Sequence, residues 1–155
     1  MTNNNENSPK KLFETRRAPG FLFDALSKAY NSHTNRRVKP LGITVSQWPV
    51  LDQIFLNEGI NQKELAKICL RDPSTLVNSL DGLEKKGFIR REPDKNDRRA
   101  FNLYITEDGI TVRNAVFKTT NDLFENATKH LTQQEIDQLY TTCISVYNAL
   151  QEIDD

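Results

Sequence analysis

The sequence has no run of apolar residues approaching the ~18 that a membrane-spanning helix requires. Its first residues, MTNNNENSPKK, are polar and lack the apolar core of a signal peptide. A cytoplasmic protein without a membrane partner is therefore expected.

Cysteine and histidine are also scarce. Cys69 and Cys143 are too few for a disulfide framework, and each is expected to be a small buried side chain, with a redox role left open. His33 and His130 lie too far apart in sequence to suggest a metal site. The sequence shows no nucleophile motif, glycine-rich phosphate loop or metal-binding helix signature. It therefore predicts neither an enzyme nor a cofactor.

The charges balance over the 155 residues but are spread unevenly. Residues 61–105 carry ten basic and seven acidic side chains, or +3, whereas residues 106–155 carry three and nine, or −6. Within residues 85–99 the count is seven basic against three acidic, or +4. A basic middle segment beside an acidic tail indicates an anionic partner for the middle segment.

Residues 72–106 contain the clearest local signals. Asp72 is expected to cap a helix through its carboxylate, with Pro73 at the first helical position and Gly87 as the stop. Three leucines share one face of this helix and are expected to be buried: Leu76, Leu80 and Leu83. The opposite face is mostly small and polar: Ser74, Thr75, Asn78 and Lys85. This pattern indicates a helix that enters a groove.

Two extended runs follow that helix. Residues 88–92 and 101–105 have strand character, and the second run alternates apolar and polar residues. The polar turn segment PDKNDRRA joins them. The sequence therefore predicts a two-stranded wing with cationic side chains near its tip.

Two helices are expected before these elements. The first should follow Pro19 and fade before Pro40, because the residue preceding a proline disfavours helical geometry. The second should have Ser46 as N-cap, Pro49 in its first turn and Gly59 at its end.

A third, short helix is expected at the capping pattern NQKE, which begins at Asn61. Its inward side chains are expected to be Leu65, Ala66 and Ile68. Only a few residues separate this helix from Asp72, so the two helices are expected to form a helix-turn-helix.

Thr106 and Thr132 are expected to cap two long helices after the wing. Together with the first helix, they carry more apolar surface than a small winged domain can cover, which favours a symmetric dimer. The expected fold is mainly α with a small β-wing. Residues 1–17 are expected to be a disordered or poorly ordered tail. A winged helix-turn-helix DNA-binding domain is expected at 43–106, flanked by a helical dimerisation region at 18–42 and 107–155.

The segment from Ser46 to Gly109 resembles the MarR family of bacterial winged-helix regulators. The matching pieces are SQWPVL, NQKELAK, DPSTLVNSLDGLEKKGFIRR, the wing DKNDRRA and NLYITEDG, in that order. With the flanking helices, the resemblance covers about residues 18–153. It implies a homodimeric repressor that binds a palindromic operator in double-stranded DNA, with possible release by a small aromatic or anionic ligand.

The resemblance also implies roles for individual residues. Three side chains of the recognition helix would meet base edges or phosphates: Ser74, Thr75 and Asn78. In the wing, Arg99 would enter the minor groove with Asp97 holding it, and Arg98 and Lys95 would meet phosphates. The chain departs from the family at Val77, where many members have a polar residue, and at Asn78, which is often arginine.

Other interpretations remain open. Tyr30, His33 and Trp48 would line a ligand pocket in such a regulator, but a place in the core is the simpler interpretation. The exposed face of the recognition helix is also compatible with a winged-helix module that binds protein and not DNA.

Overall fold

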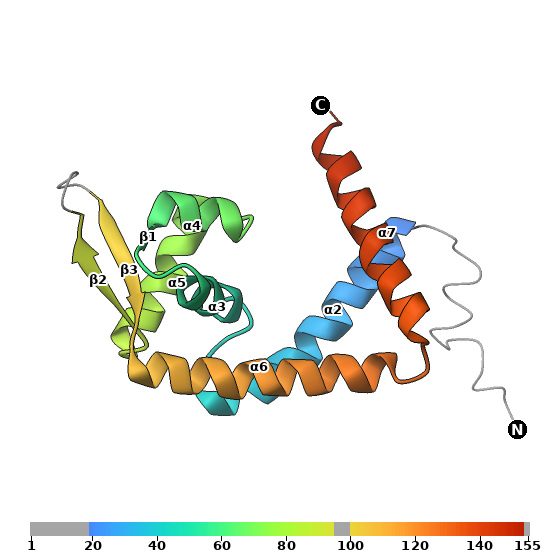
Figure 1. Cartoon of the computed structure of the whole chain (residues 1–155), viewed down its shortest axis with the longest axis horizontal. Coiled ribbons are helices and arrows are strands. Elements are labelled where there is room, and N and C mark those ends of the chain that lie inside the picture. The colour runs from blue at the N-terminus through green and yellow to red at the C-terminus, as the bar shows by residue number, and fades with distance from the viewer. Residues whose placement is uncertain (1–18, 95–99, 154–155) are drawn as a thin grey trace, which may run out of the picture. The chain divides into compact units, whose positions relative to one another are not determined.

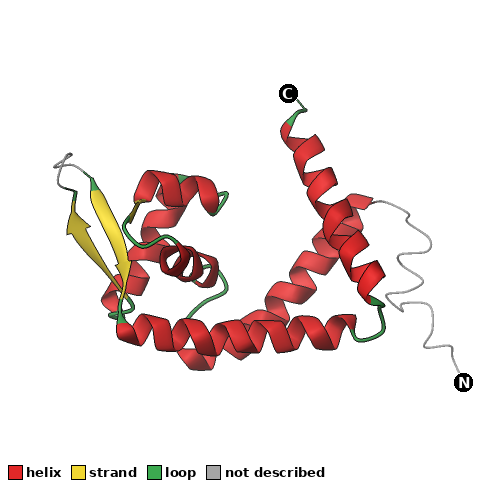
Figure 2. Ribbon diagram, viewed as in Figure 1, coloured by secondary structure: helices red, strands yellow, loops and turns green. Residues whose placement is uncertain are grey.

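The computed structural model describes residues 19–94 and 100–153 (Figure 1). The expectations for residues 1–17 and for the wing-tip residues fall outside these ranges. The chain is mainly helical with a small sheet, as predicted (Figure 2). Its elements are α2 (Pro19–Val38), the 3-10 helix η1 (Lys39–Leu41), α3 (Trp48–Leu56), β1 (Ile60–Asn61), α4 (Gln62–Ile68), α5 (Pro73–Lys85), β2 (Ile89–Pro93), β3 (Phe101–Ile105), α6 (Glu107–Thr128) and α7 (Gln133–Gln151).

The chain divides into two compact units, one up to Val116 and one from Phe117 onward. The helix α6 crosses from the first unit into the second. The assignment of segments to DNA binding and to dimerisation stays a prediction.

The sheet of the first unit is antiparallel with the strand order β1-β3-β2. The wing strands β2 and β3 pair in the register Ile89↔Ile105 and Arg91↔Leu103. The third strand, β1, pairs Ile60 with Leu103 and was not predicted. It is only two residues long, which is too short for an alternating pattern to show in the sequence.

In the core of the first unit, the apolar faces of its helices pack against one another and against the inner face of the sheet. The three leucines predicted to be buried, Leu76, Leu80 and Leu83, are completely inaccessible to solvent. They pack with side chains of the other elements, such as Val38, Ile43, Val50, Leu51, Ile54, Leu65, Ile89, Leu103 and Val116. This core supports α5 from one side and leaves its other side to solvent.

Helix capping follows the sequence in most places. The Asn61 side chain accepts a hydrogen bond from the backbone N–H of Glu64 at 3.0 Å, and Thr106 Oγ1 accepts one from Gly109 at 3.0 Å. Thr132 and Glu135 form the predicted reciprocal capping box at the start of α7. These caps depend on neighbours three residues apart, which is why the sequence predicts them.

One capping prediction is confirmed only in part and another was wrong. Asp72 does occupy the N-cap position of α5, but among the described residues its carboxylate accepts no capping hydrogen bond. The N-cap of α3 is Gln47 and not Ser46, because the hydroxyl of Thr44 accepts the Gln47 backbone N–H at 3.2 Å and prolongs the turn by one residue.

Two further predictions, one of burial and one of a helix end, were wrong. Ile68 was predicted to face inward but is 46% exposed, because α4 ends at this residue and has only one buried turn. Helix α3 ends at Leu56, and Gly59 lies in the following turn with φ of 81°.

The second unit leaves most of its apolar surface uncovered. Phe124 on α6 and Tyr140 on α7 contact each other with ring centroids 6.0 Å apart. None of the α7 residues is buried, and Cys143 is exposed, so the prediction of a buried thiol is wrong for the single chain. No helix in residues 19–94 and 100–153 is long and apolar enough to cross a membrane.

Candidate nucleic-acid interface

The outer face of α5 is polar and open to solvent. Ser74, Thr75 and Asn78 are all exposed, as the sequence predicted. Helix α4 directly precedes α5 (Figure 1). In the tight turn between them, Leu70 takes a positive φ of 52°. The Arg71 backbone N–H then bonds the carbonyl of Ala66 at 3.0 Å. The two helices therefore form a helix-turn-helix with one exposed polar face.

The segment 44–47, which precedes α3, is held from both ends of α5. Arg71 donates to the carbonyl oxygen of Ser46 at 2.7 Å and to Ser79 Oγ at 3.4 Å. Lys86 donates to Gln47 Oε1 at 2.8 Å. No sequence pattern marks Gln47 or Ser79, because only the tertiary contacts show that both polar side chains are buried.

The wing is tied to α5 by one arginine. Arg91 on β2 contacts the carboxylates of Glu84 and Asp81 on α5, each at 2.6 Å. Its neighbour Arg90 pairs with Glu92 at 3.1 Å and lies over the ring of Tyr104, 4.6 Å from its centroid. These two arginines counted toward the +4 of residues 85–99, so part of that charge serves internal ion pairs.

The four wing-tip residues of the candidate site lie outside the described residues: Lys95, Asp97, Arg98 and Arg99. The strands on either side of this segment are well tied. The backbone N–H of Asp94 bonds the carbonyl of Ala100 at 3.0 Å, and Asn102 Nδ2 donates to Asp94 Oδ2 at 2.9 Å. The assignment of the wing tip to DNA stays a prediction.

The three residues considered for a ligand pocket do not converge on one cavity described here. Tyr30 is 42% exposed on α2, and His33 accepts hydrogen bonds from Arg36 and Arg37. Trp48 is half-buried and packs against the core. Their role in ligand binding stays a prediction.

A cavity of about 660 Å³ lies between α2 and the start of α3. Most of its lining residues have polar side chains: Asn31, Ser32, Asn35, Thr44, Val45, Ser46, Pro49 and Arg71. It therefore shares Ser46 and Arg71 with the contacts that hold α5.

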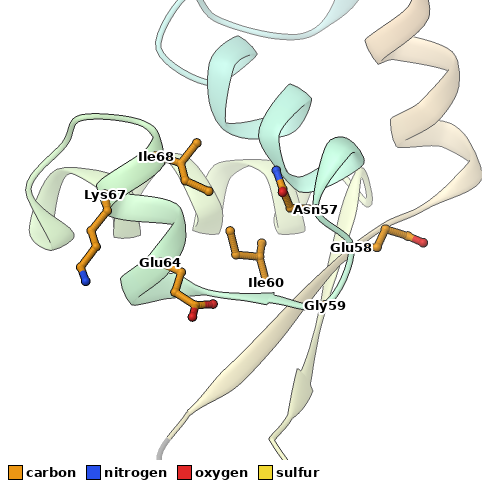
Figure 3. A pocket seen from close by; sticks show the side chains of 7 residues that line it. All are labelled: Asn57, Glu58, Gly59, Ile60, Glu64, Lys67 and Ile68. Atoms are coloured by element: carbon orange, nitrogen blue, oxygen red, sulfur yellow. The ribbon is translucent and has the colours of Figure 1, made fainter.

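A second cavity of about 550 Å³ lies where α3, β1 and α4 meet (Figure 3). Ile60 and Ile68 face its space, whereas Glu58 and Lys67 extend away from it (Figure 3). Its lining includes no predicted site residue. The described part of the chain also contains no group of three or more His, Cys, Asp or Glu that could hold a metal ion.

The half-buried thiol of Cys69 lies at the end of α4. Burial raises the pKa of this thiol above its ordinary value, and the nearby Arg71 lowers it by a smaller amount. A raised pKa leaves less of the reactive thiolate, which favours a structural role.

Comparison with known proteins identifies the MarR family. The sequence model of the MarR family matches residues 43–101. The multiple antibiotic resistance protein MarR of Salmonella typhimurium is 35% identical over 103 residues, which cover 66% of this chain and 72% of that protein. The HTH-type transcriptional regulator SarZ of Staphylococcus haemolyticus is 30% identical over 77% of this chain and 80% of its own length.

Solved structures agree with the sequence comparisons. A cysteine-to-serine variant of MarR from Escherichia coli, complexed with operator DNA, has a TM-score of 0.77 at 30% identity, covering 82% of this chain and 91% of that chain. CouR from Rhodococcus jostii RHA1, bound to p-coumaroyl-CoA, has a TM-score of 0.74 at 26% identity, covering 82% and 90%. The chain therefore belongs to the MarR family of winged helix-turn-helix transcriptional regulators, which are not enzymes.

Proposed function

We propose that the protein is a homodimeric repressor that binds a palindromic operator in double-stranded DNA. The observation that carries the proposal is the two-sided character of α5, whose leucines are fully buried while Ser74, Thr75 and Asn78 face solvent. A similar chain, MarR from Escherichia coli, has been crystallised with operator DNA. A helix supported in this way can enter a major groove without disturbing the core.

The recognition helix would supply the base contacts. Asn78 can donate to and accept from an adenine edge, a pairing worth about 1–3 kcal/mol of discrimination. Ser74 and Thr75 lie at the N-terminal end of α5, where short hydroxyl side chains suit base edges or phosphates.

The wing would bind the neighbouring minor groove and the backbone. Arg99 would enter the minor groove, oriented by Asp97, while Lys95 and Arg98 meet phosphates. An arginine in a narrow minor groove responds to groove width and potential more than to individual bases. The wing would therefore add affinity and shape selectivity, whereas α5 would supply sequence preference.

The dimer would form through the apolar surfaces that the single chain leaves open. On α7 these are Leu139, Tyr140, Ile144, Tyr147 and Leu150, with Ile153 just after it, and on α2 they are Leu22, Phe23, Leu26 and Tyr30. Exposed apolar surface of this extent on two helices normally marks an interface. A twofold dimer would present two copies of α5, about one DNA turn or roughly 34 Å apart.

A small aromatic or anionic ligand would release the protein from DNA. The structural relative CouR binds p-coumaroyl-CoA, and the cavity beside Arg71 is large enough for a small acid. Such a ligand acts only if it prefers a state whose recognition helices do not fit the operator, because equal affinity for both states shifts nothing. A thermal-shift screen of aromatic carboxylates tests this, since binding to the native state raises the unfolding temperature.

The central experiment is selection of bound sequences from a library of random duplexes, followed by affinity measurements at several salt concentrations. We expect a palindromic consensus and an affinity that falls steeply with salt, because bound phosphates release counterions. A protein that retains no duplex even at low salt is not a DNA-binding regulator. If it instead captured a protein partner at high salt, the winged domain would be a protein-interaction module.

A further inference from the structure

We infer that Arg71 is a positioning residue for DNA recognition, which holds the recognition helix against the segment 44–47 and so sets the direction in which Asn78 points. The inference rests on the proposed function, because it concerns how α5 is held while it reads DNA. It assigns Arg71 a role behind α5 and not at the DNA surface.

The turn between α4 and α5 directs Arg71 toward the back of the recognition helix. Leu70 adopts a φ of 52°, a left-handed conformation that residues other than glycine adopt at an energetic cost. The next side chain, Arg71, then reaches Ser46 and Ser79. Ser79 is only 6% exposed and belongs to the buried side of α5.

The partners of the guanidinium are uncharged. Arg71 donates to a main-chain carbonyl at 2.7 Å and to a hydroxyl at 3.4 Å, and no carboxylate within residues 19–94 and 100–153 forms an ion pair with it. A hydrogen bond from a charged donor to a neutral acceptor contributes more than one between neutral groups. Arg71 therefore fixes the segment before α3 to α5 by directional bonds.

A second contact fixes the other end of α5 to the same segment. Lys86, just after α5, donates to Gln47, whose side-chain amide also accepts the backbone N–H of Thr44. The Gln47 amide lies so close to Gly82 that a Cβ at that position would overlap it. Contacts at Ser79 and at Gly82 are nearly one helical turn apart, so together they restrict both the tilt and the rotation of α5.

Rotation of α5 matters because Asn78 immediately precedes Ser79. Successive residues of an α-helix are about 100° apart, so any turn of Ser79 about the axis carries Asn78 with it. Bidentate recognition of a base edge tolerates errors of only about 0.5 Å. Loss of Arg71 should therefore weaken sequence-specific contacts more than contacts to the DNA backbone.

The test compares Arg71→Met with the wild-type dimer on two duplexes, the consensus selected by the wild type and a scrambled duplex of the same composition. We expect at least a tenfold loss of affinity for the consensus, with affinity for the scrambled duplex changed less than twofold. The slope of log affinity against log salt should stay unchanged. Arg36→Met removes an exposed guanidinium from α2 and should leave both affinities as in the wild type.

The salt slope separates positioning from direct contact. If Arg71 bound a phosphate, Arg71→Met would weaken both duplexes alike and lower the slope by about one. That result would overturn the inference, and so would retention of full consensus affinity. Stoichiometric titration with DNA measures the active fraction of each variant, so loss of folded protein is not mistaken for loss of specificity.

A milder pair of variants covers the case in which Arg71→Met does not fold. Ser79→Ala removes one acceptor, and Arg71→Lys keeps the charge but not the two-pronged geometry. Each variant should lower the ratio of the affinity for the consensus duplex to the affinity for the scrambled duplex, with the latter affinity unchanged. If both variants kept the wild-type ratio, the inference would be refuted. If the wild type itself selects no consensus, the proposed function fails, which is a different result.

Discussion

Nη1 of Arg91 on the wing strand β2 lies 2.6 Å from Oε2 of Glu84 on the recognition helix α5. The other terminal nitrogen of the same guanidinium lies 2.6 Å from Asp81, one turn earlier on α5. One planar cation thus joins two carboxylates on one helix face to the sheet. This contact couples the position of the wing to that of the helix that it accompanies.

Replacing Arg91 with Met should lower the free energy of unfolding by about 1–2 kcal/mol, because two carboxylates lose a shared partner that is mostly shielded from solvent. The expected loss of free energy of unfolding is small because both carboxylates are themselves well exposed. Denaturant unfolding measures the change. Lys28→Met, which breaks the exposed Lys28–Asp24 pair, should change stability by less than about 0.5 kcal/mol. Equal effects of the two variants would show that Arg91 is an ordinary surface charge.

Gly109→Ala should destabilise the protein by about 3 kcal/mol. A Cβ at Gly109 would overlap the backbone carbonyl of Phe88, which cannot move aside as a side chain can. Gly20→Ala is the matched control, since a Cβ at that position meets nothing within 4 Å. Thermal unfolding should show a lower transition for Gly109→Ala and an unchanged or slightly raised one for Gly20→Ala. A Gly109→Ala protein as stable as wild type would contradict the close packing of α6 against the backbone of Phe88, just before β2.

Tyr147→Glu should convert the proposed dimer into monomers. Tyr147 is among the exposed apolar side chains of α7, and burying a charge there would oppose association. Sedimentation equilibrium should show about half the wild-type mass. Ser145→Glu adds the same charge on the opposite, polar face of α7 and should remain dimeric. Association of Tyr147→Glu at wild-type strength would place the interface elsewhere.

Asn78→Ala should reduce sequence preference more than total affinity. The expected loss is about 1–3 kcal/mol of discrimination at one base pair of each half-site, with binding to unrelated DNA unchanged. Arg99→Ala should instead weaken binding itself, because it removes a charge from the proposed minor-groove contact. Titration against the consensus and against single-base variants distinguishes the two. Wild-type behaviour of both variants would show that the assigned DNA contacts are wrong.

The capping box of α7 should contribute stability that depends on pH. The pKa of Glu135 is lowered, chiefly because its carboxylate accepts a hydrogen bond from the backbone N–H of Thr132. A second, smaller cause is the hydrogen bond that the carboxylate accepts from the Thr132 hydroxyl. A carboxyl whose pKa is lowered by folding stabilises the folded protein at pH values above its unfolded-state pKa of about 4.5. This contribution is lost as the pH falls through the lower, folded-state pKa.

The unfolding temperature of Glu135→Ala should therefore lie further below that of wild type at pH 7 than at pH 3. Gln138→Ala changes an uncharged side chain on the same helix, so its unfolding temperature should differ from that of wild type by a similar amount at both pH values. A Glu135→Ala difference that does not change with pH would mean that the carboxylate is not needed in its charged form.

The features predicted from sequence were those that depend on neighbours within a helical turn or a strand. The spacing of Leu76, Leu80 and Leu83 predicted the buried face of α5, and the pattern from Thr132 to Glu135 predicted a capping box. Each of these signals is local, because it is set by a period of 3.6 residues or by a hydrogen bond between residues three apart.

Two features that sequence reasoning missed depend on residues far apart in the chain. Strand β1 exists only because Ile60 meets Leu103 of β3. Gln47 is buried because α5 and Lys86 lie against it, across 39 residues of sequence. The outward position of Ile68 has a local cause: it follows from where α4 ends, which the capping pattern at its start does not determine.

The sequence alone determined the order of the α-helices and the two wing strands, the polar face of α5 and the family to which the chain belongs, since apolar spacing, caps and motif order all reside in neighbouring residues. Only the tertiary structure decided what holds that face in place: Arg71 on Ser46 and Ser79, and Arg91 on Glu84. The physical reason is that a hydrogen bond or an ion pair needs two groups within about 3 Å. For groups distant in sequence, that distance is set by the packing of the core.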